Sequence, residues 1–136
     1  MAFGAFEFTM FSGPVPADGT TTIGEPLELR HKHALVVEGN LARTSGGTTI
    51  DVYVQTSVDG GNNWVDVMNL HFTTSSLRKV GTVRYSLTGG GVITPTDGAL
   101  GANTVNDGVI GTWVRHKTVV SGSYVGTLSI KGVALQ

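Results

Sequence analysis

The sequence predicts an all-β protein, an antiparallel β-sandwich of jelly-roll or Greek-key type with an extended N-terminal arm. Three observations favour this fold class. Glycine is abundant, at 20 of 136 residues, and supplies the positive φ that tight turns between short strands need. Several segments alternate apolar and polar residues with a period of two, as half-buried strands do. No window shows the 3.6-residue apolar period of a helix, so we expect almost no helix.

The length of the chain is that of one domain with a sizeable core. We divide it into an N-terminal extended arm or edge segment, residues 1–18, and a single sandwich domain, residues 19–136. The net charge is −1. A field this weak gives no reason to expect direct contact with nucleic acid.

The chain has no cysteine, which excludes disulfides, thiolate metal sites and a cysteine nucleophile. Extracellular domains of this size often carry disulfides, so their absence favours assembly in a reducing cytoplasm. No apolar run approaches the ~20 residues that span a bilayer. The apolar N-terminus holds Glu7 and no Lys or Arg, which argues against a signal peptide. We therefore expect no membrane partner.

Large apolar side chains are concentrated at the N-terminus: Phe3, Phe6, Phe8, Met10 and Phe11. The period of two within this group is typical of an edge strand packed on its own domain. Alternatively, the segment is an arm that packs on a neighbouring subunit, because side chains of this kind need cover. Residues 12–19 contain Gly and Pro and predict an extended linker and a turn. We take the five apolar side chains as candidates for a partner interface.

The next two segments predict an edge strand followed by a central one. Residues 20–31 alternate loosely, and Pro26 marks an edge strand or a break within it. Residues 33–42 contain a nearly continuous apolar run, which favours a more central position. Residues 44–48 predict a turn.

Residues 49–56 and 64–70 form the clearest β-hairpin of the sequence, and Ser57 to Trp64 is its turn. After a polar segment, residues 77–87 alternate again. Residues 89–91 predict a flexible turn, and Val92 and Ile93 predict a short strand that Pro95 ends. Residues 94–108 then form the longest predicted loop, and loops of this length in compact domains are often interaction elements. We therefore add Asp97, Leu100 and Asn103 to the interface candidates.

The last segments predict a second hairpin, with residues 109–120 and 124–135 flanking a short turn at Gly122. One face of the final strand is expected to hold Tyr124, Leu128 and Ile130. No repeat of 20 to 50 residues is visible, which argues against a propeller or a solenoid.

The turn of the first hairpin resembles the Asp-box of sialidases and related β-propellers. Ser57, Asp59, Gly61 and Trp64 match that pattern, and Asn63 replaces the usual Thr. An Asp carboxylate in such a turn can accept backbone N–H bonds, while the Trp can anchor the turn on the sheet. In that family the box is a structural turn away from the catalytic site. The resemblance therefore implies a structural turn and no sialidase activity.

Candidates for metal binding and acid–base chemistry are few. His31 and His33 lie two apart, as on one face of a strand, and His71 or His116 could approach them. Strand-surface histidines are the favoured interpretation. Asp51 and Asp66 lie on the paired strands of the hairpin and could be cross-strand neighbours, as an acid and a base would be. A glycosidase also needs a cleft lined by aromatic side chains, so we expect no enzyme and no catalytic residue.

Other polar groups favour ordinary structural roles. The Asp and Asn side chains of residues 94–98 and 106–108 are conceivable Ca²⁺ ligands, but their spacing fits Asx turns better than an EF-hand. Arg78, Lys79 and Arg84, with Arg115 and Lys117, could form a modest basic patch. In a nearly neutral chain we interpret them as solvated or subunit-facing strand surface. No cofactor and no metal are predicted.

The pattern of turns and strands across residues 45–132 is similar to that of small structural proteins of tailed bacteriophages and prophages. The resemblance rests on residues 46–61, 64–67, 72–73, 96–100, 103–105, 107–111, 114–115 and 122–124. It contains no chemically diagnostic motif, and the N-terminal segment has no counterpart in it.

The resemblance implies a virion component, a decoration (cementing) protein on the outside of the capsid. Its implied partners are the major capsid protein and further copies of itself, as a homodimer or homotrimer. The implied location is the capsid surface of the virion, after assembly in the host cytoplasm. Such a protein needs a rigid fold and contact segments, and many weak contacts on a symmetric shell add through multivalency.

Two other functions remain open from the sequence. A carbohydrate-binding or tail- or fibre-associated β-sandwich would stack exposed Trp64, Trp113 or Tyr124 on sugar rings. A flat, exposed row of these rings would favour that alternative, and core-facing rings would favour a structural role. A hydrolase would require a convergent carboxylate or Ser–His set in a pocket.

Overall fold

The structure is a computed structural model that describes residues 5–85 and 91–136. The described residues form nine strands and no helix, which confirms the all-β prediction. The described residues therefore contain no helix that is long and apolar enough to cross a membrane. The strands are β1 (Phe6–Pro14), β2 (Thr21–Ile23), β3 (Leu27–Glu28), β4 (Ala34–Gly46), β5 (Thr49–Ser57), β6 (Val65–Phe72), β7 (Leu77–Arg84), β8 (Trp113–Ser121) and β9 (Tyr124–Leu135).

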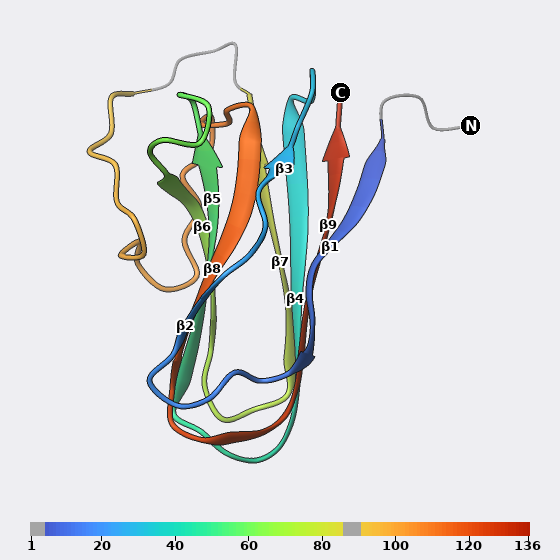
Figure 1. Ribbon diagram of the computed structural model, residues 1–136, viewed down its shortest axis with the longest axis vertical. Helices are drawn as coiled ribbons and strands as arrows, with labels where there is room; N and C mark the ends of the chain where they lie inside the picture. Colours follow the sequence, from blue (N-terminus) through green and yellow to red (C-terminus); the bar gives the residue numbers. More distant parts are fainter. Residues whose placement is uncertain (1–4, 86–90) are drawn as a thin grey trace.

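Two antiparallel sheets pack face to face (Figure 1). The four-stranded sheet has the order β1-β9-β4-β7, and the five-stranded sheet has the order β2-β8-β5-β6 with β3 also on β8. The pairs are nested: β1 with β9, β2 and β3 with β8, β4 with β7, and β5 with β6. The chain is thus one long ribbon folded over on itself, with the predicted first hairpin at its tip. This arrangement is a jelly roll, one of the two topologies that the sequence predicts.

The predicted second hairpin is wrong in its pairing. Both of its strands exist, but β8 lies in one sheet and β9 in the other. Their connection passes between the sheets beside the link from β4 to β5, where the Thr48 amide donates to the Ser121 carbonyl at 2.9 Å. Gly122 has a φ of 89°, and a Cβ there would lie 2.5 Å from the Thr48 amide nitrogen. The glycine that suggested a tight hairpin turn is required by this close approach of two crossing segments.

Two predicted strand boundaries also differ, and one predicted strand is absent from the described residues. β4 continues to Gly46 through a bulge after Arg43, so the turn before β5 is shorter than expected. β8 begins at Trp113, because residues before it belong to the long loop. Val92 and Ile93 form no strand. The neighbouring edge of β6 is already bonded by residues 96, 104 and 106, which leaves these two residues without a partner strand in the described structure.

The predictions for the break at Pro26, for the central strand and for the buried face of β9 are confirmed. β2 and β3 are separated at Pro26, and β4 lies between β9 and β7. Alternation in β9 buries Leu128 and Ile130, as expected.

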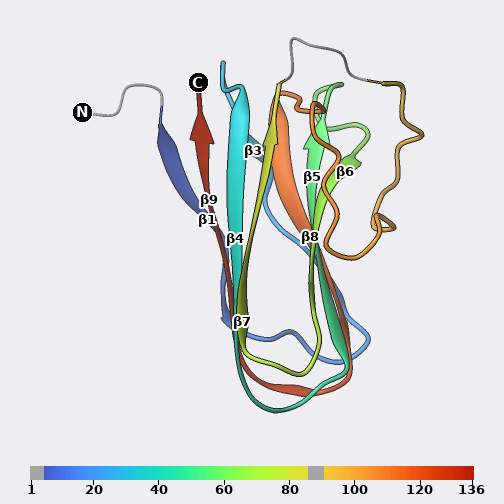
Figure 2. The same cartoon turned by 180° about the vertical axis from the view of Figure 1, so that it is seen from behind.

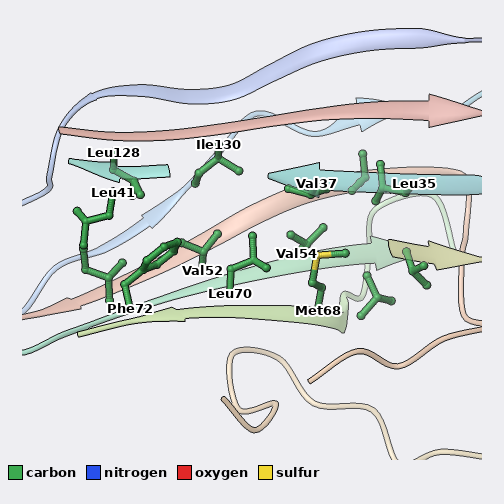
Figure 3. Close-up of a cluster of buried hydrophobic side chains, with 14 of the residues drawn as sticks. Leu35, Val37, Leu41, Val52, Val54, Met68, Leu70, Phe72, Leu128 and Ile130 are labelled. Atoms are coloured by element: carbon green, nitrogen blue, oxygen red, sulfur yellow. The ribbon is translucent and has the colours of Figure 1, made fainter. Parts of the chain in front are cut away.

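The core lies between the sheets and is almost entirely aliphatic (Figure 3). Inward-facing side chains of both sheets interdigitate there, as sandwich packing requires. Those labelled in Figure 3 are Leu35, Val37, Leu41, Val52, Val54, Met68, Leu70, Phe72, Leu128 and Ile130.

From Phe6 to Pro14, the N-terminal segment is the edge strand β1, so the first of the two interpretations describes this part of the chain. Phe8, Met10 and Phe11 are partly buried and pack against the core, while Phe6 is more exposed. Phe3 lies outside the described residues. The apolar period of two reflects inward-facing positions, with a bulge at Met10 that brings Phe11 onto the same face.

Candidate functional site

The turn between β5 and β6 is closed by its own side chains. The Ser57 hydroxyl donates to Asp59 Oδ1 and accepts from the Gly61 amide, both at 2.8 Å. Asp59 accepts from the Asn63 side chain at 2.7 Å and from the Asn63 backbone amide at 2.9 Å. Both glycines of the turn have positive φ. These bonds, first among them that of the Asn63 side chain, lower the pKa of Asp59 to about 2. All three of these hydrogen bonds to the carboxylate come from residues of the turn, so the carboxylate serves to close it.

Trp64 anchors the turn on the sheet through a contact with Arg115. Its ring lies under the guanidinium of Arg115, with the Arg115 Cζ atom 4.3 Å from the ring centroid. Arg115 Nε donates to Gln55 Oε1 at 2.8 Å. The ring is half-buried in this stack on the outer face of β5 and β8. Asn63, which replaces the usual Thr of the Asp-box, provides two of the hydrogen bonds to Asp59.

A buried carboxylate on β6 holds the long loop. Asp66 is fully buried and accepts the backbone amides of Gly98, Ala99 and Leu100 at 2.8 to 3.1 Å. The Thr96 hydroxyl donates to it at 2.8 Å. Three successive amides directed at one anion form a nest, an arrangement that fixes a loop backbone without help from a sheet.

The same loop covers the open edge of β6 (Figure 2). The Asp66 amide donates to the Thr96 carbonyl, the Asn69 amide to Thr104, and the Asn106 amide to Val67, at 2.8 to 3.0 Å. Met68 and Val105 form a bridge. An exposed strand edge is a template for unwanted pairing, so these bonds also protect the sheet.

The three loop residues predicted as interface candidates all contribute to this attachment. Asp97 accepts from Gln55 Nε2 at 2.7 Å and from Lys117 Nζ at 3.0 Å, and the Gln55 bond is the main reason that its pKa is lowered. Asn103 Oδ1 accepts from the His71 amide and from Lys79 Nζ. The Leu100 carbonyl accepts from the Asn69 side chain at 2.8 Å.

The polar side chains of the loop therefore face the domain, and its large exposed side chains are apolar. In the described residues 91–112, which precede β8, the exposed large hydrophobic residues are Val92, Ile93 and Val105. A rigidly held loop that presents aliphatic groups is suited to contact with another protein surface.

The basic residues are mostly paired within the described parts of the chain. Arg78 forms a bidentate pair with Glu38, with both N···O distances 3.1 Å, and Lys117 pairs with Asp97. Lys79 also donates to the His71 carbonyl and lies 5.5 Å from the Phe72 ring centroid. Because Arg78 and Lys117 are neutralised by neighbouring carboxylates, the described residues named here do not form a concentrated basic patch.

The two carboxylates weighed as an acid–base pair are not cross-strand neighbours, so that hypothesis is wrong. In the β5–β6 register Asp51 lies opposite His71, and Asp66 lies opposite Gln55. A bulge after Val54 shifts the register by one residue. Asp51 Oδ1 lies 2.7 Å from His71 Nδ1, and Asp66 is occupied by the loop.

The suggested histidine pair is also wrong. His31 has a φ of 56° and lies in the turn before β4, so it shares no strand face with His33. His33 contacts Tyr85, with 6.2 Å between ring centroids. Within residues 5–85 and 91–136, no group of three or more His, Asp or Glu side chains could share a metal ion.

Among the aromatic side chains weighed for sugar stacking, Tyr124 lies apart from the two tryptophans. Trp113 is paired with Ser57 on the five-stranded sheet, whereas Tyr124 is paired with Gly46 at the start of β9 in the other sheet. The Tyr124 hydroxyl donates to the Thr73 carbonyl at 2.7 Å. One face of Trp64 is covered by Arg115. These three rings do not form the exposed row that sugar binding would require.

The outer face of the four-stranded sheet holds a shallow groove of about 640 Å³. Its lining comes from β1, β4, β7 and β9 and includes Val36, Glu38, Val80, Lys131 and Val133. Figure 1 shows the long loop on the opposite side of the sandwich, so the two surfaces lie back to back.

No protein-family model and no curated protein sequence matches the chain. Among solved structures, the crystal structure of SPBc2 prophage-derived protein YomS aligns over 97% of this chain and 93% of that chain. The TM-score is 0.45 and the sequence identity is 16%. At that level of similarity, the fold assignment rests on the strand order and the function on the surfaces described above.

Proposed function

We propose that this chain is a non-enzymatic virion structural protein of a tailed bacteriophage or prophage. It binds the outside of the capsid and stabilises neighbouring major-capsid subunits. The phage assignment rests on the sequence resemblance across residues 45–132. The jelly-roll fold occurs in both viral structural proteins and lectins, so the fold alone does not select the function.

The observation that carries the proposal is the anchored loop. Asp66 and the β6 edge fix the backbone of residues 96–106, where Val105 remains exposed, and Val92 and Ile93 are exposed just before this segment in the chain. A contact segment that is already ordered loses little conformational entropy on binding. Each loop would make a modest contact, and many copies on a symmetric shell would add through multivalency.

The proposal is tested by adding the purified protein to expanded capsids that lack it. We expect the protein to co-sediment with the capsids and to raise the temperature at which they release DNA. Val92→Asp should weaken co-sedimentation at least tenfold, since a charge on an exposed contact side chain must be desolvated. Ile23→Asp, a similar change on the exposed edge strand β2, is the control and should bind normally.

Unchanged heat stability of capsids saturated with the protein would refute the cementing function. Binding to tails and not to heads would place the protein elsewhere in the virion. The carbohydrate-binding alternative is tested by applying the same protein to a glycan array, where the proposal predicts no specific signal.

A further inference from the structure

The outer face of the four-stranded sheet is ordered in rows across its strands. In one row Val133 of β9 lies beside Val36 of β4, and in the next Lys131 lies beside Glu38. β1 extends these rows with Glu7 and Thr9, and β7 extends them with Thr82 and Val80. The long loop lies on the far side of the molecule and leaves this face open (Figure 1).

At the centre of these rows, Lys131 and Glu38 carry opposite charges and lie on either side of the line between β9 and β4. Rotation of a second copy by 180° about an axis along that line places each β9 against the other copy's β4. Lys131 of each copy then faces Glu38 of the other, and Val133 faces Val36. The same rotation brings Glu7 near Thr82 and Arg84 of the other copy. The charges and the apolar groups are thus self-complementary, as an isologous interface requires.

From this arrangement we propose that the open sheet face is a two-fold interface between two copies of this chain. Stacked sheets lie ~10 Å apart, a gap that Lys and Glu side chains can bridge when they extend from opposite faces. Glu38 already accepts from Arg78 on its own sheet. A carboxylate has about four lone-pair sites, so it can accept from both groups.

The face is large enough for a specific contact. The face is four strands wide, with about 4.8 Å between neighbouring strands, and about 27 Å long in the direction of the strands. Its projected area is therefore about 500 Å² for each copy. Two copies together reach the ~1,000 Å² at which specific interfaces begin. Because only part of the face is apolar, we expect a dimer of modest affinity. The dimer would carry its two anchored loops on opposite outer sides.

The test uses charge reversal and subunit mixing, measured by sedimentation equilibrium without capsids. The wild-type protein is expected to dimerise. Lys131→Glu or Glu38→Lys places like charges at both central contacts and should weaken self-association on the order of 10- to 100-fold. An equimolar mixture of the two variants restores both Lys–Glu contacts in the heterodimer and should associate like the wild type. Glu25→Lys, an exposed change between β2 and β3, is the matched control and should dimerise normally.

A monomeric wild-type protein, or a mixture of variants that remains monomeric, would overturn the inference. So would charge-reversed variants that dimerise as tightly as the wild type. Circular dichroism on each variant separates lost association from lost folding, and recovery in the mixture excludes misfolding directly. If Lys131→Glu abolished capsid binding by a monomeric protein, the face would belong to the shell contact instead. Capsid binding is measured separately, so either proposal can fail alone.

Discussion

His116 places an ionisable ring in the interior of the sandwich, on the inner face of β8. Its Nδ1 atom lies 2.9 Å from the Thr118 hydroxyl, and its ring meets Phe11 edge-on at 5.9 Å between centroids. Gly24 lies against the ring, where a Cβ would be 2.4 Å from Cδ2. Burial lowers the pKa of His116 from 6.5 to about 4.

We predict that this histidine makes the fold acid-sensitive. Between pH 6.5 and 4 the unfolded chain binds a proton that folded His116 does not, so the free energy of unfolding falls by about 3 kcal/mol over that range. Below pH 4 both states are protonated at this site, and the loss stops growing. Urea unfolding of the wild type and His116→Gln at pH 7, 5.5 and 4.5 checks this. An equal pH slope in both proteins would contradict it.

At this scale the sequence is informative about local contacts and uninformative about distant ones. The Ser57–Asp59–Gly61 turn is predictable because its partners lie within a few residues. The sequence indicates Asp66 only as a possible acid, since its amide donors lie 32 to 34 residues later in the chain. The signal that could have revealed it is an Asp on the outer face of a buried strand followed by a Gly-rich loop.

Asp66 makes more hydrogen bonds to the long loop than any other side chain of the described residues. Asp66→Asn keeps the shape of the carboxylate and removes its charge, which weakens the bonds from Gly98, Ala99 and Leu100 together. We expect the free energy of unfolding to fall by about 2–3 kcal/mol. Amide hydrogen exchange in residues 96–108 should accelerate more than exchange in β4.

The matched control is Asp97→Asn. This carboxylate is half exposed and pairs with Lys117, so its loss should cost less than about 1 kcal/mol. Unchanged exchange in the loop of Asp66→Asn would show that the β6 edge bonds alone hold it.

Strand existence was well predicted, but of the two predicted strand pairs only the β5–β6 hairpin is correct. The alternation in residues 124–135 identifies β9 and its inward face correctly. It contains no information on whether β8 or β1 pairs with β9, because every antiparallel partner satisfies the same period. Short Gly-containing turns suggest hairpins, yet Gly122 serves a crossing between sheets. In a jelly roll, the partner of each strand depends on the path of the whole chain.

At the scale of the molecule, nested pairing separates early contacts from late ones. β5 and β6 are joined by a short turn, whereas β1 and β9 come from distant parts of the chain. Closing the outer pairs costs more loop entropy, so the central hairpin should form first. Val54→Ala in β5 should therefore slow folding, and Leu128→Ala in β9 should mainly accelerate unfolding. Chevron plots of both buried-site variants check this order, and the reverse assignment of rates would contradict it.

The position of β1 also determines how the molecule bears tension. Phe6 pairs with Ala134 at one end of the β1–β9 ladder, and Pro14 pairs with Thr127 at the other. A pull on Phe6 and Leu135 loads the nearest rung first, so the ladder opens bond by bond like a zipper. Each bond is individually weak. A load that enters through the anchored loop and leaves through the opposite sheet is shared by the whole core. A protein with this fold that resists force should therefore contact its partners through the outer faces of the sandwich and not through its chain termini.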